Sequence, residues 1–441
     1  RRWLMLLLFF TVSMSNAYQW IQYGIISNII MKFYAVEAVA VDMISMVYMI
    51  FYILLIVPSS WLLEKKGMRV TLISACVFNS AGAWIKVASA RPDLYWVTLL
   101  GQCVCAIGQV LILGIPPRLA AVWFGQNEVS SACSIGVIGN QLGCAIGFLV
   151  PPLLVPNVDH RDVLGNHLRL MFYTTAGVTT ALLVLVVVVF QKEPPSPPTL
   201  AQAKQVLSEG SSYSSSLLRL LQNRAFALLL LSYGILVGAS YTISTLLNRL
   251  IIHFYPGEEK NAGRTGLTFI LTGIVASLLC GLWLDRSKTF KQTTFAMYLL
   301  TLVGMLVFTF TLDRGHLWLL FITTGIVGLF MFGYLPLGFE YGVELSYPEA
   351  EGTSSGLLNC SAQVFGIIFI FSEGSVIDRW GPLAGNIFLS CFLLIGTVTS
   401  GLIKSELWRQ KANLENSLAT GKRQLLPENQ HPPAKSKEDH L

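Results

Sequence analysis

Twelve long apolar stretches constrain this chain more than any other feature of its sequence. A helix needs about 20 consecutive apolar residues to cross a bilayer, and every stretch reaches that length. Only 12% of the 441 residues are charged, about half of the roughly 25% that is typical of soluble domains. The sequence therefore predicts an all-α membrane protein with twelve transmembrane helices. The stretches lie at 3–31, 42–63, 69–89, 94–124, 128–155, 168–190, 225–252, 265–284, 292–312, 316–343, 353–377 and 383–404.

A Pro- and Ser-rich segment separates the first six stretches from the last six. It contains Glu193-Pro194-Pro195-Ser196-Pro197-Pro198, a composition that is typical of linkers. Lys and Arg gather in this segment, in the tail and in the loops on the same side of the expected topology, which predicts that both termini are cytoplasmic. We expect an N-terminal six-helix bundle over 1–190, a cytoplasmic linker over 191–223 with a surface helix near 200–207, a C-terminal six-helix bundle over 224–405 and a disordered cytoplasmic tail over 406–441.

The two halves of the chain repeat each other. Phe33-Tyr34 ends the first stretch and Phe254-Tyr255 ends the seventh, and the same offset carries Trp20 onto Tyr241. An acid followed by bases ends the second stretch of each half. Internal repeats with a substrate site near the membrane midplane are typical of transporters. The repeats therefore predict two pseudo-symmetric bundles around a central site.

A group of polar and aromatic residues lies inside the first stretch. Polar groups are costly in hydrocarbon, so at that depth they face a bundle interior or a water-filled cavity. This group predicts the wall of a central pathway. Its members are Ser15, Asn16, Tyr18, Gln19, Trp20, Gln22 and Tyr23.

Several classes of function are disfavoured by composition. All eight cysteines lie in apolar stretches without a CxxC pair, and the six histidines lie in loops, at the ends of stretches or in the tail. No nucleophile–base or metal-ligating group is apparent, so we expect neither an enzyme nor a cofactor. The net charge of +6 comes from loops and tail, so no nucleic-acid partner is expected and membrane lipids are the expected surroundings.

The acid–base loops resemble the signature of the major facilitator superfamily. Their sequences are Glu64-Lys65-Lys66-Gly67-Met68-Arg69 and Asp285-Arg286-Ser287-Lys288. The fifth stretch resembles the glycine-rich fifth helix of that superfamily, with Gly136, Gly139 and Gly143 at spacings that let helices approach closely.

Further motifs resemble the feline leukaemia virus subgroup C receptor family, nearer to its second paralogue. The likeness runs from the first stretch to the last, and Met43 and Leu54 depart from the family pattern. It implies a plasma-membrane carrier of choline and ethanolamine; haem export has also been attached to the family. The matching motifs are Gln19-Trp20-Ile21-Gln22-Tyr23-Gly24, Val122-Trp123-Phe124-Gly125, Ser244-Thr245-Leu246-Leu247-Asn248, Gly333-Tyr334-Leu335-Pro336-Leu337-Gly338-Phe339-Glu340 and Ser354-Ser355-Gly356-Leu357-Leu358-Asn359.

A choline site needs aromatic faces, because the methyl groups of a quaternary ammonium donate no ordinary hydrogen bonds. Trp20 and Tyr241 are the predicted walls, one from each half, and the resemblance assigns both to the family's pocket. For Trp20 the alternative is core packing. The resemblance also assigns ligand contact to Gln109 and Gln363, which lie mid-stretch and offer both donors and acceptors. Their alternative role is an interhelical hydrogen bond, worth ~0.6 kcal/mol in a bilayer. Two further candidates are Asn16 and Gln19.

The charged residues near the stretches predict either a gate or structural ion pairs. They are Glu64, Arg69, Arg118, Asp285, Arg286 and Glu340. No carboxylate lies in the middle of the first, fourth, seventh or eleventh stretch, and a proton-coupled symporter usually needs one there. The sequence therefore favours facilitated, uncoupled transport.

Two other functions stay open at this point. A haem exporter usually needs a His, Cys, Met or Tyr ligand for the iron, and no histidine lies at the centre of a stretch. A receptor without transport would bind a partner, such as a viral envelope protein, at its outer loops.

Overall fold

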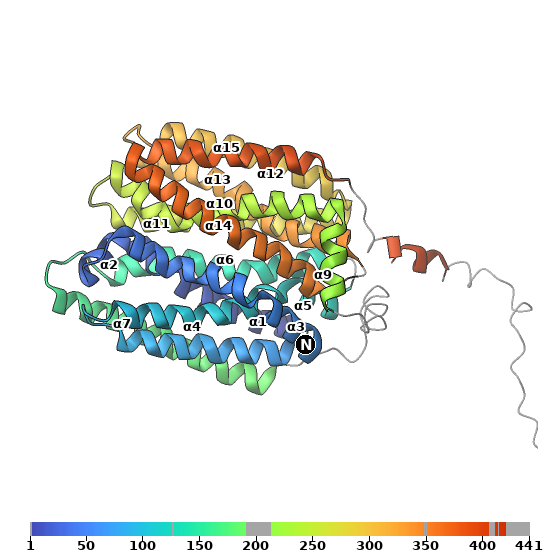
Figure 1. Ribbon diagram of the computed structural model, residues 1–441, viewed down its shortest axis with the longest axis horizontal. Helices are drawn as coiled ribbons and strands as arrows, with labels where there is room; N and C mark the ends of the chain where they lie inside the picture. The colour runs from blue at the N-terminus through green and yellow to red at the C-terminus, as the bar shows by residue number, and fades with distance from the viewer. Residues whose placement is uncertain are drawn as a thin grey trace, which may run out of the picture.

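The computed structural model describes residues 2–125, 128–190, 213–347, 349, 351–404, 411–412 and 414–419. The predicted surface helix at 200–207 and most of the predicted tail lie outside these residues. Figure 1 shows long helices that run roughly parallel in two bundles. In the N-terminal half the elements are α1 (Arg2–Ile21), η1 (Gly24–Ile26), α2 (Ser27–Tyr34), α3 (Ala38–Ala88), α4 (Tyr95–Leu113), α5 (Ile115–Trp123), α6 (Val129–Leu154) and α7 (Arg161–Val189). Then follow α9 (Tyr213–Gln222), α10 (Arg224–Phe254), α11 (Glu259–Ser287), α12 (Phe290–Thr311), α13 (Leu317–Ser346), α14 (Glu351–Trp380) and α15 (Pro382–Gly401).

Eleven helical segments among the described residues are long and apolar enough to cross a membrane. One of them, α3, has 51 residues, or about 76 Å at 1.5 Å per residue, more than twice the ~30 Å hydrocarbon core. Helical geometry is interrupted within it at Gly67, whose φ of 85° suits glycine. The two predicted stretches 42–63 and 69–89 meet there, so the eleven segments make twelve crossings, and the predicted fold class is confirmed.

Two predicted stretches are broken helices rather than continuous ones. The first, predicted over 3–31, ends as α1 at Ile21 and resumes through η1 to α2. The fourth, predicted over 94–124, breaks at Gly114, and Pro116 follows in the first turn of α5. Proline lacks a backbone N–H and suits the first turn of a helix, which explains the second break.

Glycines set the close approach of helices within each half. A Cβ added to Gly143 of α6 would lie 2.1 Å from the carbonyl oxygen of Met14 in α1. In the other half, a Cβ added to Gly238 of α10 would lie 2.8 Å from the backbone nitrogen of Gly366 in α14. The packing role predicted for the glycine-rich fifth stretch is confirmed, and the C-terminal half repeats it.

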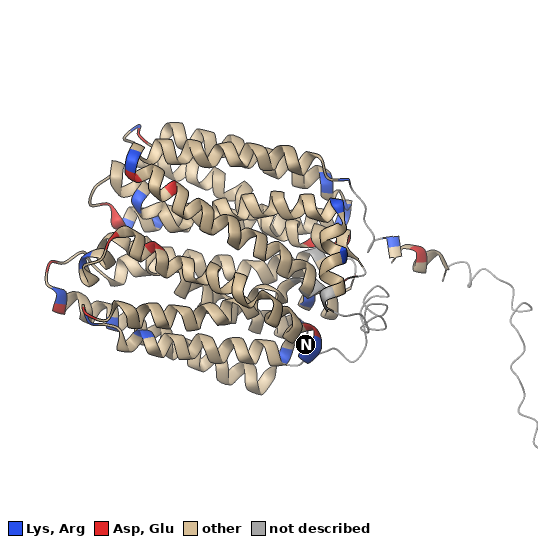
Figure 2. Ribbon diagram, in the orientation of Figure 1, with Lys and Arg blue, Asp and Glu red and all other residues tan. Residues whose placement is uncertain are grey.

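The halves meet along two pairs of helices, because α6 packs against α11 and α3 packs against α14. Figure 1 shows that the start of α1, the helix α9 and the end of α15 lie at one end of the bundles, here called the α9 end. The opposite end, which carries α2, is the α2 end. Charged residues gather at both ends and leave the middle nearly free of charge (Figure 2). This is the pattern expected of a chain that crosses a membrane.

Candidate functional site

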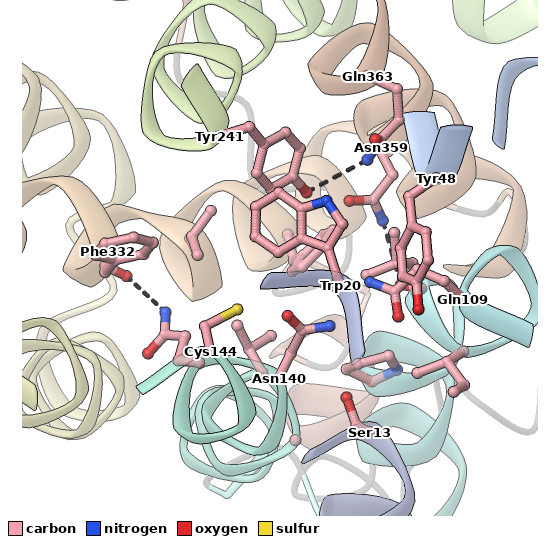
Figure 3. Close-up of a pocket in the computed structure, with 18 of the residues that line it drawn as sticks. Ser13, Trp20, Tyr48, Gln109, Asn140, Cys144, Tyr241, Phe332, Asn359 and Gln363 are labelled. Carbon is pink, nitrogen blue, oxygen red and sulfur yellow. Dashed lines mark hydrogen bonds between the residues drawn. The ribbon is translucent and has the colours of Figure 1, made fainter. Parts of the chain in front are cut away.

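A cavity of ≈ 60 Å³ lies between the two halves. Its walls come from α1, α3, α4, α5 and α6 on one side and from α10, α13 and α14 on the other. Figure 3 shows Trp20 and Tyr241 beside each other in it, with Gln109 and Asn359 close by. The space is large enough for several water-sized groups, and its position between the halves suits a transported molecule.

Two aromatic rings from opposite halves meet at this cavity. The ring centroids of Trp20 and Tyr241 are 5.5 Å apart, and their planes make an angle of 70°. Trp20 Nε1 donates a hydrogen bond to the carbonyl oxygen of Ser45 at 3.2 Å. The indole is therefore fixed at its edge to α3 and lines the cavity beside Tyr241.

Amide side chains provide the polar part of the lining. Gln363 Nε2 donates to the hydroxyl of Tyr241 at 3.3 Å. The Oε1 atom of Gln109 is buried and has no hydrogen-bond partner among the described residues. An unpaired buried acceptor is costly unless a ligand or water satisfies it. Gln109 thus offers an acceptor to whatever occupies the cavity.

The described lining contains no ionisable acid or base of the Asp, Glu, His, Lys or Arg type. Attraction for a cation must then come from ring faces and amide or hydroxyl dipoles. Such contacts select for a charge that is spread over a bulky apolar group.

Asn16 and Gln19 do not line the cavity. Asn16 Nδ2 donates to Asn79 Oδ1 at 3.1 Å and to the carbonyl oxygen of Cys105 at 3.2 Å. Gln19 also bonds to Asn79, and its Oε1 accepts from Lys86 Nζ at 3.1 Å. The structure therefore places both candidates in a polar network inside the N-terminal half, away from the predicted substrate.

Polar contacts between the halves close the α2 end of the cavity. Ser27 Oγ donates to Asn248 Oδ1 at 2.9 Å. One turn of α3 from its start, Asp42 forms an ion pair with Arg249 of α10 at 3.2 Å. Arg249 also pairs with Asp378 of its own half.

Other contacts close the α9 end. Tyr52 of α3 donates to the carbonyl oxygen of Gly356 in α14 at 2.9 Å. Asn359 Nδ2 donates to the carbonyl oxygen of Leu113 at 3.2 Å. Contacts between the halves therefore lie on both sides of the cavity along the length of the bundles.

The acids of the two acid–base loops also join the halves at the α9 end. Glu64 of α3 accepts a hydrogen bond from Thr353 of α14. Asp285 of α11 accepts from the backbone N–H of Ser131 in α6 at 3.1 Å. These contacts fit the predicted gating role of Glu64 and Asp285.

The bases of these loops have different positions. Arg69 donates to the carbonyl oxygens of Phe190 and Val187, both at 3.0 Å. It therefore caps the C-terminus of α7, where a positive charge is favourable. Arg286 is exposed in the last turn of α11.

Two further predicted charges lie at the cavity's α9 side. Arg118 on α5 interacts electrostatically with Glu64. Glu340 on α13 is buried and interacts with the thiol of Cys133 on α6. Both therefore lie where the halves meet.

Sequence reasoning missed the ion pair of Asp42 with Arg249, the buried Lys86 and the cavity residue Tyr48. The missed signal was a charge inside an apolar stretch, which usually marks a functional or paired residue. Tyr48 carried no such signal, because a tyrosine in a stretch is ordinary.

Comparison with known proteins identifies the family. A model of the Major Facilitator Superfamily matches residues 5–370. The choline/ethanolamine transporter flvcr2b of Danio rerio is 62% identical over 421 residues, which cover 95% of this chain and 87% of that protein. The choline/ethanolamine transporter FLVCR1 of Felis catus is 49% identical over 430 residues, which cover 97% and 76%. The chain belongs to the feline leukaemia virus subgroup C receptor family of this superfamily.

The family assignment confirms the resemblance read from the sequence, including its nearness to the second paralogue. A solved structure of the E. coli fucose:proton symporter FucP has a TM-score of 0.66 at 15% identity, covering 90% of this chain and 98% of that one. That likeness shows the fold alone. As a member of the major facilitator superfamily, the chain is a multi-pass membrane transporter and not an enzyme.

Proposed function

We propose that this chain is a facilitative transporter of choline and ethanolamine in the plasma membrane, with both termini in the cytoplasm. The observation that carries the proposal is the meeting of Trp20 and Tyr241, one from each half, with ring centroids 5.5 Å apart at the cavity between the halves. Relatives named as choline/ethanolamine transporters support the substrate class.

The cavity suits the two parts of choline separately. Its trimethylammonium group lies against the faces of Trp20 and Tyr241, where each cation–π contact is worth ~0.5–2 kcal/mol. Its hydroxyl donates to the unpaired Oε1 of Gln109 or bonds to the amide of Gln363. The primary ammonium of ethanolamine donates hydrogen bonds itself, so Gln109 is also the acceptor that this smaller substrate needs.

Alternating access follows from the contacts that close each end. Opening the α2 end requires the ion pair of Asp42 with Arg249 to separate, while opening the α9 end requires Tyr52 to leave Gly356. Rocking of the halves about the Trp20–Tyr241 site exposes it to one side at a time. Without a carboxylate in the described lining, transport proceeds uncoupled from protons.

Haem export finds less support. Haem is anionic, whereas the described lining of the cavity carries no cationic side chain that would attract it. Binding of a viral envelope protein at outer loops stays a prediction, and it is compatible with transport.

The test is uptake of labelled choline and ethanolamine into cells that express the chain. We expect the intact chain to raise uptake of both. Trp20→Ala at normal surface abundance should lower choline uptake about tenfold or more, because it removes one aromatic wall. Gln363→Ala should lower it by a smaller factor. Trp96→Ala is the matched control, because that indole is 74% exposed and outside the cavity.

Two results would reject the proposal. One is full choline uptake by Trp20→Ala. The other is haem efflux without any choline or ethanolamine uptake by the intact chain.

A further inference from the structure

A lysine is buried inside the N-terminal half, beside the substrate cavity's first helix. Lys86 on α3 is 1% exposed, and none of the ion pairs found in the described part of the chain includes it. A charge within a membrane span is costly and usually has a functional reason. Neither the alternating-access contacts nor the cavity lining uses Lys86.

The partners of Lys86 are neutral groups that accept hydrogen bonds or attract cations. Its Nζ donates to Gln19 Oε1 at 3.1 Å and lies 5.7 Å from the centroid of the Tyr23 ring. Cys105 is a further neighbour. An ammonium group has three donors and no acceptor, so it matches this set of partners.

Gln19 forms hydrogen bonds to neighbouring helices through both its side chain and its backbone. Its Nε2 donates to Asn79 on α3, and its Oε1 also accepts from the thiol of Cys105 at 3.1 Å. Its carbonyl oxygen accepts from Gln102 Nε2 of α4 at 3.2 Å. Helices α3 and α4 thus hold Gln19 from several directions.

Gln19 lies at the point where the first span breaks. Helix α1 ends at Ile21, two residues later, and the next regular element is η1. Trp20 follows Gln19 directly, so the backbone that Gln19 fixes also sets the direction of the indole. Regular α-helix ends just after Gln19. The side-chain bonds of Gln19 to Lys86 and Asn79, and the bond of its carbonyl oxygen to Gln102, therefore add to the remaining backbone bond from Gln22 N–H to the Tyr18 carbonyl oxygen in holding this turn.

We propose that Lys86 is a positioning residue for the substrate site: by holding Gln19 at the break in the first span, it sets the angle of Trp20 and favours choline over ethanolamine. This inference rests on the proposed function. Choline depends on the face of the indole, because its methyl groups donate no hydrogen bonds. Ethanolamine has an ammonium that donates hydrogen bonds to the amide groups of the cavity, so a tilted indole harms it less.

The experiment compares uptake of the two substrates by Lys86→Met and Lys86→Arg in the full chain. Met fills most of the lysine's volume without a donor, and it leaves Gln19 Oε1 with only the weak thiol donor of Cys105. Arg keeps donors at this place. Ser80→Ala is the matched control: Ser80 is a buried polar residue on the same helix, and it bonds to Thr180 on α7 instead.

We expect Lys86→Met to lower the kcat/KM for choline about tenfold, mainly through KM, which is the order of one cation–π contact. The kcat/KM for ethanolamine should change less than about threefold. Lys86→Arg should recover at least part of the choline preference, and Ser80→Ala should keep the wild-type ratio. If Lys86→Met does not reach the cell surface, Lys86→Leu, which also lacks a donor, carries the same comparison.

A purely structural role predicts a different result, in which surface abundance falls and the ratio of choline to ethanolamine uptake per molecule stays unchanged. That outcome overturns the inference. It is distinguishable from failure of the proposed function, which shows as absence of uptake of both substrates by the wild-type chain.

Discussion

Arg249 and Asp42 connect the two halves of the transporter across the α2 end of the cavity. The guanidinium nitrogen Nη1 lies 3.2 Å from Asp42 Oδ2, and both side chains are largely buried, at 14% and 8% exposure. Arg249 pairs in addition with Asp378 on α14 and donates to the carbonyl oxygen of Gly374. When the halves separate at this end, Arg249 loses Asp42 and keeps a carboxylate in its own half.

This arrangement predicts the effect of Asp42→Asn. The substitution removes the attraction between the halves, while Asp378 continues to neutralise Arg249, so the α2 end should open more readily. Cys144 lines the cavity and reports this opening. We expect a membrane-impermeant thiol reagent, applied to the outside of cells, to label Cys144 several-fold faster in Asp42→Asn, as measured by mass spectrometry.

Asp378→Asn is the control for this prediction, because Asp378 is 60% exposed and belongs to the same half as Arg249. It should leave labelling of Cys144 nearly unchanged. Equal or slower labelling in Asp42→Asn would show that the ion pair does not hold the α2 end closed.

The hydroxyl of Tyr241 should matter less than its ring. Tyr241→Phe keeps the aromatic face but leaves Gln363 Nε2 without its acceptor in the cavity. Losing one such bond costs about 1 kcal/mol, so we expect choline uptake to fall about fivefold or less. Tyr241→Leu removes the face as well and should cost more. Equal uptake by the two variants would argue against a cation–π role for this ring.

Gly143 should tolerate no side chain. A Cβ there would lie 2.1 Å from the carbonyl oxygen of Met14, and because that atom belongs to backbone, α1 and α6 would have to move apart. Overpacking of this kind costs about 1–3 kcal/mol. We expect Gly143→Ala to lower the melting temperature of the purified protein by several degrees. Gly177→Ala is the control, since no atom beyond its own stretch of helix backbone lies within 4 Å of a Cβ there.

The meeting of Trp20 and Tyr241 was predictable because it follows from the repeat. Two halves with the same fold place equivalent positions at the same depth, and both positions carry aromatic residues. The spans were predictable for a simpler reason, since apolar length is a strong signal in a membrane protein.

The direction of Gln19 could not be predicted from its neighbourhood in the sequence. Each residue of a helix turns by about 100° from the one before it. Phe9, Ser13 and Trp20 share the face of α1 that lines the cavity, so Gln19 must point elsewhere. The sequence alone does not say which face of a helix with polar residues on several sides is turned to the substrate.

The pairing of Asp42 with Arg249 was unpredictable for a different reason. The two residues are 207 positions apart in the sequence, and each is a single charge within an apolar stretch. Averaging hydropathy over a span hides such a charge, and only the packing of the halves brings the two together.

The electrical driving force gives the last prediction. Choline carries a permanent positive charge, and the described cavity lining holds no carboxylate or imidazole that would carry a proton with it. The membrane potential then contributes ~2.3 kcal/mol per 100 mV to inward movement. In proteoliposomes, we expect an inside-negative potential to drive several-fold accumulation of choline, and we expect dissipation of that potential to abolish it.

A proton gradient imposed while the potential is clamped at zero should produce no accumulation. The surface ion pair of Asp159 with Lys32 should not change this result at near-neutral pH. Lys32 holds the pKa of Asp159, in the loop between α6 and α7, below its usual value through a hydrogen bond and charge attraction. The contribution of ionised Asp159 to the stability of the folded protein is therefore fully present above the ordinary carboxyl pKa. It is lost only as the pH falls through the lowered pKa, which is far from neutrality. Accumulation that follows the proton gradient at zero potential would contradict uncoupled transport, because it would require a titratable group that moves with the substrate.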